Sequence, residues 1–235
     1  MKTVFIADGH LKGPADPNSL SLVRFLDSLR QTSTLVILGD LFDFWTGSNE
    51  TVEKNYRPVL DALLRLKERG VRIIYLEGNH DFSMGRYFRE TLKAGVHPES
   101  LDISIDGKRL YLSHGDTVSM SPGYRLWRAY LRSPLFKLMA WVARPKNVWK
   151  IAMGLSNRSR KRTYTDRSNR TDALLREFAG KKLAEGFSSV VLAHSHVAGV
   201  HREGKGVYAN PGSWAGDMSY LVYDKGAFRV ERWKG

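Results

Sequence analysis

The chain has 235 residues, of which 37 are Lys or Arg and 24 are Asp or Glu, giving a formal net charge of +13. Hydrophobic residues make up 42% and aromatic residues 11%, which is enough apolar material for a sizeable core and excludes global disorder. There is no cysteine, so disulfide frameworks, thiolate metal sites and cysteine nucleophiles are excluded. Any bound metal must use oxygen or imidazole ligands.

Strand-like and helix-like segments alternate over the first part of the chain. The apolar runs KTVFIA, TLVIL and VRIIYL are typical of buried strands, and the segments between them carry apolar residues at helical spacing. This order predicts parallel strands joined by right-handed crossovers. The expected elements are a strand at 2–7, a helix at 18–31, a strand at 34–38, a helix at 52–69 and a strand at 71–76.

The rest of the chain, apart from one unusual segment, continues the alternation. A hairpin is expected around Asp106-Gly107. No repeat or low-complexity linker interrupts the chain, so we expect a single domain over 1–235. The further expected elements are strands at 101–105 and 108–113, a helix at 171–185, a strand at 188–193, and short strands at 197–202, 206–209, 219–223 and 227–232.

The unusual segment, here called the basic segment, is residues 120–171. It holds thirteen Lys or Arg residues and one acid, a net +12, whereas the other 183 residues have a net charge of +1. It also holds three of the six tryptophans, and its apolar residues recur at three- and four-residue steps. This pattern predicts short amphipathic helices, broken at Pro134 and Pro145. Its sharp boundaries indicate an insertion into one domain.

Composition leaves three interpretations of the basic segment open. It is compatible with a helical hairpin that packs on the domain and has a solvated basic rim. Basic helices with an opposite aromatic face also suit an anionic membrane surface or a lipid ligand. The same charges could bind the phosphates of a nucleic acid.

Residues that can bind metal follow five of the expected strands. Ligands of open α/β sheets bind outside the carboxyl ends of the strands, so these residues are expected to meet at one rim. Each fragment alone is common in turns, but five of the seven histidines fall in the set. Its members are Asp8, His10, Asp40, Asn79, His80, Asp81, His114, His194 and His196.

The residue types indicate which metals could bind there. Carboxylate, amide and imidazole ligands without thiolate suit Mn²⁺, Fe²⁺ or Zn²⁺. Seven ligands drawn from these nine residues would exceed what one tetrahedral ion needs and would suit two ions that share a carboxylate, an arrangement that serves in-line displacement at phosphorus. Nucleotide hydrolysis on a Walker loop and dehydrogenase chemistry are disfavoured, because the sequence has no Gly-rich phosphate loop.

Together these blocks resemble the calcineurin-like metallophosphoesterases. The resemblance implies an α/β fold, a four-layer αββα sandwich of two mixed β-sheets flanked by helices. It implies one metal held by Asp8, His10 and His196, and another held by Asn79, His114 and His194. Asp40 would bridge the two ions. His80 would lie beside the phosphate, where it stabilises the transition state or protonates the leaving group, and Asp81 would orient His80.

A narrower resemblance rests on the stretches GDLFDFW at 39–45, NHDF at 79–82 and HGDT at 114–117. They are similar to the UDP-2,3-diacylglucosamine hydrolases of lipid A synthesis, which carry a helical lid where this chain has its basic segment. The resemblance implies cleavage of the pyrophosphate bond of an acylated UDP-sugar, giving UMP and a diacyl sugar 1-phosphate. Two divalent ions are implied. Mn²⁺ is the expected ion, and Fe²⁺ and Zn²⁺ are the alternatives.

The same resemblance implies where the enzyme works and what it contacts. We expect a peripheral protein on the cytoplasmic face of the inner membrane, since the sequence begins with no recognisable secretory signal. Neither a nucleic acid nor an obligate protein partner is expected. The implied substrate contacts are Asn79, His80, Tyr124, Ser159, Arg160, Arg162, Thr163 and His194.

Some features stand outside these patterns. The best-known members of the narrower family have Arg where this chain has His80. We expect Asn210–Trp214 to form a tight turn with its Trp in the core, and Asp43 and Trp45 either to shape the pocket or to cap a helix. The alternative function is that of another metallophosphoesterase, such as a phosphodiesterase, nucleotide pyrophosphatase or nuclease. A non-enzymatic scaffold is a third hypothesis.

Overall fold

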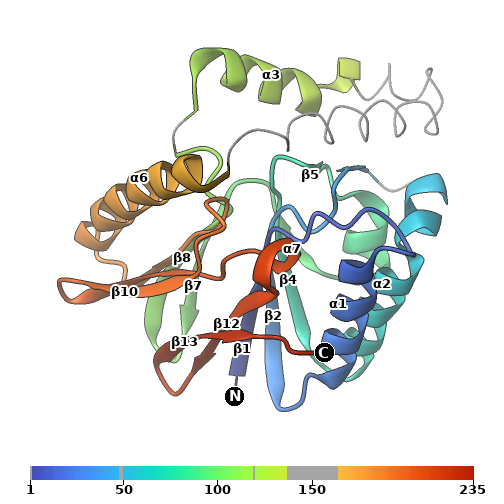
Figure 1. Ribbon diagram of the computed structural model, residues 1–235, viewed down its shortest axis with the longest axis horizontal. Helices are drawn as coiled ribbons and strands as arrows, with labels where there is room; N and C mark the ends of the chain where they lie inside the picture. Colours follow the sequence, from blue (N-terminus) through green and yellow to red (C-terminus); the bar gives the residue numbers. More distant parts are fainter. Residues whose placement is uncertain (1, 48–49, 119, 137–163) are drawn as a thin grey trace.

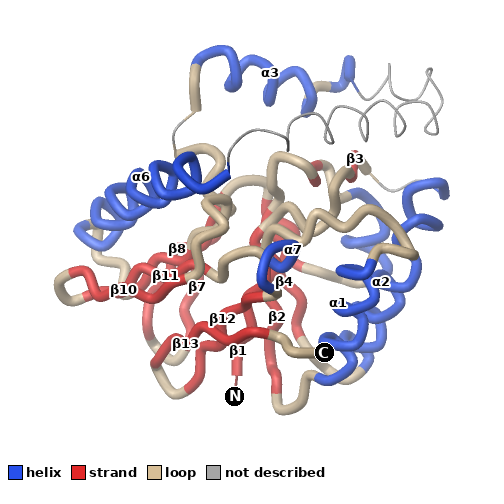
Figure 2. Tube along the Cα trace, in the orientation of Figure 1, coloured by secondary structure: helices blue, strands red, loops and turns tan. Residues whose placement is uncertain are grey.

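The computed structural model describes residues 2–47, 50–118, 120–136 and 164–235. Two β-sheets stack on each other, with helices on the outer side of each (Figures 1 and 2). The first sheet has the order β13-β12-β1-β2-β4-β6. Its strands are β1 (Lys2–Ile6), β2 (Thr32–Leu38), β4 (Arg72–Leu76), β6 (Gly95–His97), β12 (Ser219–Asp224) and β13 (Ala227–Arg232).

The second sheet has the order β10-β11-β9-β8-β7. In the first sheet β1, β2, β4 and β6 pair in parallel, and β12 pairs antiparallel with β1 and β13. In the second sheet β8, β9 and β11 pair in parallel, and the outer strands β7 and β10 are antiparallel to their neighbours. The strands are β7 (Ser100–Ile105), β8 (Lys108–Ser113), β9 (Ser189–Val191), β10 (Gly199–Glu203) and β11 (Gly206–Asn210). A small parallel pair joins β3 (Trp45–Thr46) to β5 (Asp81–Phe82).

The helices cover the outer faces of the sandwich. Helices α1 and α2 lie on the first sheet, and α6 lies on the second (Figure 1). The helical segments are α1 (Pro17–Ser28), α2 (Glu50–Glu68), the π-helix η1 (Tyr87–Thr91), α3 (Pro122–Arg132), α6 (Tyr164–Ala184) and α7 (Trp214–Asp217). In the described ranges, no helix is both long and apolar enough to cross a bilayer.

Side-chain alternation along the strands explains the layers. On β1, Val4 and Ile6 belong to the apolar cluster under α1 and α2, whereas Phe5 belongs to the cluster between the sheets. A strand buried on both faces needs apolar residues at every position, which is why the sequence reads as an unbroken apolar run. On the far side, Leu175 and Ala179 of α6 complete a third cluster against the second sheet.

The predicted fold class is confirmed, and so is the parallel order of the first three long strands. The boundaries differ at two helices. The helix expected over 18–31 ends at Ser28, because Leu29 leaves helical geometry and Gln31 takes a positive φ of 55°. Helix α6 begins at Tyr164, seven residues before the expected start. The expected boundary of the basic segment near residue 170 therefore falls inside a helix.

The structure describes the ends of the basic segment but not its middle. The first expected amphipathic helix is α3, which ends at Arg132, two residues before Pro134. Ser121 caps its first turn by accepting a hydrogen bond from the Tyr124 amide. The second expected break, at Pro145, lies outside the described residues.

We predict that Phe25→Ala destabilises the protein by about 3–5 kcal/mol, the usual cost of truncating a buried aromatic side chain. Phe25 is 1% exposed, and its ring packs against Trp214, Tyr220 and Trp233. Urea unfolding measures the change. The matched control is Leu20→Ala on the same helix, where the side chain is 50% exposed and a change within about 0.5 kcal/mol is expected. Equal losses for both variants would contradict the assigned core.

Candidate dimetal site

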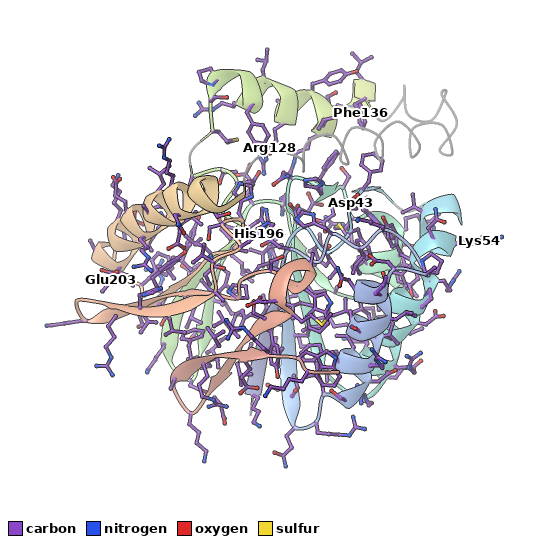
Figure 3. The ribbon with its side chains drawn as sticks, viewed as in Figure 1. Asp43, Lys54, Arg128, Phe136, His196 and Glu203 are labelled. Atoms are coloured by element: carbon purple, nitrogen blue, oxygen red, sulfur yellow. The ribbon has the colours of Figure 1, made fainter. Side chains whose placement is uncertain are left out.

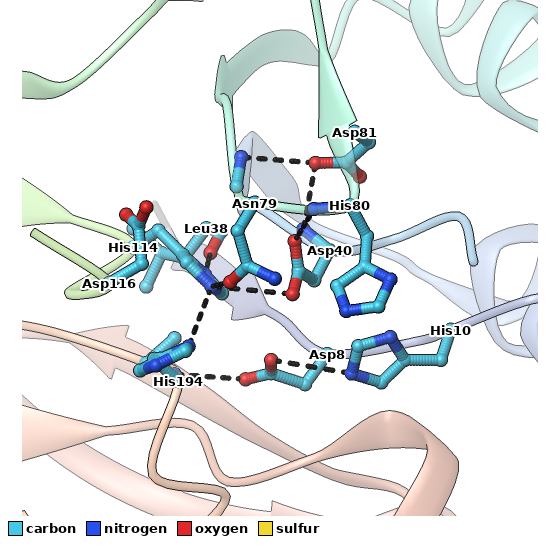
Figure 4. Close-up of polar contacts among 12 residues, drawn as sticks. Asp8, His10, Leu38, Asp40, Asn79, His80, Asp81, His114, Asp116 and His194 are labelled. Carbon is cyan, nitrogen blue, oxygen red and sulfur yellow. Dashed lines mark hydrogen bonds and ion pairs between the residues drawn. The ribbon is translucent and has the colours of Figure 1, made fainter. Parts of the chain in front are cut away.

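The sandwich brings the metal-capable residues together at the carboxyl ends of β1, β2, β4, β8 and β9 (Figure 4). Within the described residues, three groups have potential ligand atoms that all lie within 4.8 Å of one another. Two of them share Asp40, and two share His10. The groups are Asp8, His10 and His196; Asp40, His114 and His194; and His10, Asp40 and His80.

The first group is built around Asp8, which is fully buried. Its Oδ1 atom lies 3.2 Å from Nε2 of His196 and 3.8 Å from Nε2 of His10. Its Oδ2 atom accepts a hydrogen bond of 3.1 Å from the backbone amide of His194. One oxygen of Asp8 therefore faces two imidazoles of the first group. The other oxygen holds the backbone of His194, which belongs to the second group.

The second group is centred on His114, which is also fully buried. Its Nδ1–H donates to the Leu38 carbonyl at 2.7 Å, which directs Nε2 into the site. That Nε2 lies 3.3 Å from Oδ1 of Asn79, 3.2 Å from Nδ1 of His194 and 3.5 Å from Oδ2 of Asp40. A histidine whose other ring nitrogen donates to a carbonyl is oriented as metal-binding histidines usually are.

Five of these residues have an unusual backbone conformation. Non-glycine residues with positive φ cost of order 1–3 kcal/mol each and cluster at functional sites. Their φ values lie between 41° and 67°, and β-strands that end in such residues turn sharply at the rim. The five are Asp8, His10, Asp40, His194 and His196.

Asp81 holds the loop that carries Asp40. Its buried carboxylate accepts hydrogen bonds from the backbone amides of residues 40, 41, 42 and 78, and from the hydroxyl of Tyr75. Burial and the charge of Asp40 raise the pKa of Asp81 to about 7, although these donors act in the opposite direction. Gly78 makes the close approach possible, since a Cβ there would lie 2.1 Å from Oδ1 of Asp40.

The ring of His80 is oriented by a different group from the one we expected. Its Nδ1–H donates to the carbonyl oxygen of Asp43 at 3.0 Å, while the oxygens of Asp81 are taken up by the loop amides and Tyr75. The backbone amide of His80 donates to Oδ1 of Asp40 at 2.8 Å. His80 lies beside His10, with 4.9 Å between the ring centroids. Asp43 thus helps to shape the site, and Trp45 is a fully buried core residue.

The pKa of one buried carboxylate of the site is lowered, whereas the pKa values of its imidazoles are shifted in both directions. Burial raises the pKa of Asp8, but the neighbouring imidazoles outweigh it and the pKa falls to about 2. Burial lowers the pKa of His10 and that of His194 to about 4. Burial also acts to lower the pKa of His114, yet the charge of Asp40 raises it well above the ordinary value.

These features fit a pair of divalent ions. Nδ1 of His10 is buried and makes no hydrogen bond in the described part of the chain, and the buried Oδ1 of Asp8 faces the imidazoles of His196 and His10. Buried polar atoms are rarely left in this state unless they serve an ion or a reaction. The donors are carboxylate, amide and imidazole groups, which suit borderline cations. Bound metal would displace the proton from His114, because histidine ligates in its neutral form.

The segment after β11 makes hydrogen bonds to the backbone at Asp8. Ser213 Oγ donates to the Asp8 carbonyl at 2.9 Å, and the amides of Trp214 and Ala215 donate to the carbonyls of residues 7 and 8. Trp214 itself is fully buried, as expected, but it starts the short helix α7 rather than closing a turn. The segment therefore serves the core and the site together.

Helix α3 is tied to this rim by two arginines that the sequence did not single out. Nε of Arg128 lies 3.2 Å from Oδ2 of Asp116, just after His114. Nη2 of Arg132 donates to the Gly78 carbonyl at 3.3 Å, and its Nη1 lies 3.4 Å from Oε2 of Glu77. No sequence signal separates these arginines from the other basic residues around them, since their acidic partners lie outside α3.

The predicted substrate contacts are divided between described and undescribed residues. Tyr124 lies in the first turn of α3, where burial and the charges of Asp116 and Asp40 raise its pKa. Asn79, His80 and His194 lie in the site. The other predicted contacts fall outside the described residues: Ser159, Arg160, Arg162 and Thr163.

Comparison with known proteins agrees with this geometry. UDP-2,3-diacylglucosamine hydrolase from Aeromonas salmonicida is 29% identical over 99% of this chain and 93% of its own length. The enzyme of that name from Histophilus somni strain 129Pt is 26% identical over 97% and 98%. The one from Ralstonia nicotianae is 33% identical over 60% of this chain, and the match spans about half of that relative.

Solved structures share the fold. An archaeal phosphodiesterase superposes with a TM-score of 0.50 at 14% identity over 99% of both chains. A phosphoesterase from E. coli superposes with a TM-score of 0.50 at 18% identity, over 100% of this chain and 94% of the other. The calcineurin-like phosphoesterase family matches residues 1–198, from the first strand to just beyond His196. The chain therefore belongs to the calcineurin-like phosphoesterases, a family of hydrolases that use divalent metals.

Proposed function

We propose that this protein hydrolyses the pyrophosphate bond of UDP-2,3-diacylglucosamine, releasing UMP and 2,3-diacylglucosamine 1-phosphate. The observation that carries the proposal is a cluster of carboxylate and imidazole groups that could hold metal, in a chain that aligns almost end to end with hydrolases of that name. The alternative, another phosphodiesterase or nuclease of the same fold, shares the donors but is not favoured by those relatives.

We further propose how the donors are shared. One ion would be held by Asp8, His10 and His196, the other by Asn79, His114 and His194, with Asp40 between them. Mn²⁺ is the ion we expect, on the chemistry of the donors. When bound, two such ions supply Lewis-acid polarisation of the phosphate oxygens and lower the pKa of water.

The chain's own residues supply the rest of the chemistry. Because Nδ1 of His80 donates to the carbonyl of Asp43, Nε2 is directed away from that carbonyl and available to a phosphate oxygen. With a proton on Nε2 as well as on Nδ1, His80 would from there stabilise charge or donate that Nε2 proton to the leaving group. The five hydrogen bonds that Asp81 accepts hold the loop of Asp40 in place. Asp40 in turn accepts a hydrogen bond from the His80 amide, which fixes the two residues relative to each other.

The basic segment is proposed to be a lid that binds the acylated sugar at an anionic membrane surface. Its first helix, α3, is fixed over the rim by Arg128 and Arg132, which places Tyr124 near the charges of Asp116 and Asp40. Two large apolar side chains, Leu126 and Leu135, are 77% and 58% exposed there. Apolar side chains among basic ones suit lipid better than nucleic acid.

We predict that the Mn²⁺-loaded protein releases UMP from UDP-2,3-diacylglucosamine, and that this activity is much higher than its activity on a small chromogenic phosphodiester. The acyl chains and uridine add binding contacts that the small ester lacks. Quantifying UMP by chromatography checks the prediction. Activity on the small ester without UMP release would discard the lipid substrate and keep the metal-dependent hydrolase.

We predict that Asp40→Ala loses stoichiometric binding of two Mn²⁺ and all measurable hydrolysis, because the variant lacks the carboxylate between the two donor groups. Metal content after dialysis, measured by mass spectrometry, reports the loss. Asp61→Ala on the surface of α2, where the side chain is 44% exposed, is the control and should retain both ions. Two retained ions in Asp40→Ala would refute the bridging role.

We predict that His80→Ala keeps both Mn²⁺ ions but lowers kcat by about 10²–10⁴-fold, the usual range for a general acid or base. Steady-state kinetics and metal analysis on the same sample separate the two effects. His97→Ala, which changes a histidine on the edge strand β6, should leave kcat unchanged. A full rate in His80→Ala would remove His80 from the chemistry.

A further inference from the structure

A buried polar network contacts the loop His194-Ser195-His196 through the side chain of Ser195. At its centre is Asp172 of α6, which is 6% exposed. Oδ1 of Asp172 accepts hydrogen bonds from Ser195 Oγ at 3.2 Å and from the Tyr208 hydroxyl at 3.0 Å. Oδ2 accepts from Nε of Arg176 at 2.9 Å. Figure 3 shows His196 near the end of α6.

The Ser195 hydroxyl connects this network to the loop. Besides donating to Asp172, it accepts from Nδ2 of Asn210 at 2.9 Å and from the amide of Val197 at 3.3 Å. Its one donor and both acceptor positions are therefore used. The residues on either side, His194 and His196, have φ values of 67° and 62°, a conformation that persists only where the surroundings impose it.

We infer that Asp172 is a positioning residue: through Ser195 it fixes the two left-handed histidines of the loop and so sets the affinity of the site for metal. A buried carboxylate is costly unless it is paired and hydrogen-bonded, and apolar side chains would fill the same space at lower cost. Asp172 lies on the helix that ends the basic segment. It therefore also joins the position of α6 to the geometry of the metal donors. This inference rests on the proposed function.

The test measures Mn²⁺ affinity rather than turnover. Isothermal titration of metal-free protein is compared for wild type, Asp172→Asn, Ser195→Ala and the double variant. Each single variant should bind Mn²⁺ about tenfold more weakly, within the range seen when residues that orient metal ligands are changed. Since both changes break one connection, the double variant should bind more tightly than the product of the two single effects predicts.

The matched control is Glu177→Gln, an acid-to-amide change on the same helix at a position that is 64% exposed. It should bind Mn²⁺ as the wild type does. If Asp172→Asn does not fold, Ser195→Ala alone carries the test, because it leaves the Asp172 pairs with Arg176 and Tyr208 in place. Wild-type Mn²⁺ affinity in the single variants, even with a lower melting temperature, would overturn the inference while leaving the proposed function intact. Strictly multiplicative effects in the double variant would overturn it as well. A wild-type chain that binds no Mn²⁺ would overturn the proposed function first.

Discussion

The site depends on one constraint, the left-handed backbone at residues that carry metal donors. A strand that ends in such a residue turns its next side chain back over the sheet edge, which lets several strands converge on one small volume. This conformation is unfavourable for residues other than glycine, so each loop needs outside support. Buried carboxylates provide it. Asp81 accepts hydrogen bonds from backbone amides of the Asp40 loop, and Asp8 accepts one from the amide of His194.

The four-layer architecture makes this support possible. Both sheets place parallel strands at the centre, so the carboxyl ends of β1, β2 and β4 face those of β8 and β9 across the apolar layer between the sheets. The carboxylates lie where this layer ends. There they are buried enough to be costly unless they are hydrogen-bonded, which ties the order of the loops to the packing of the core.

The sequence was a good guide wherever the signal was local. Continuous apolar runs predicted the buried strands, and the residues after them were correctly expected to cluster, since strand ends in a parallel sheet share an edge. It was a poor guide to contacts between distant segments. Nothing near Asp172, Arg128 or Arg132 distinguishes them from surface charges, and their roles depend on partners from other elements. The short strands β3 and β5 were also missed, because a strand of two residues shows no periodicity in the sequence.

The two-ion arrangement is the central claim, and the most direct test is anomalous diffraction from crystals grown with Mn²⁺. We predict two peaks roughly 3.5–4 Å apart, as in other two-metal sites. One should be bounded by Asp8, His10 and His196, the other by Asn79, His114 and His194, with Asp40 touching both. A single peak, or two peaks that do not share Asp40, would contradict the arrangement.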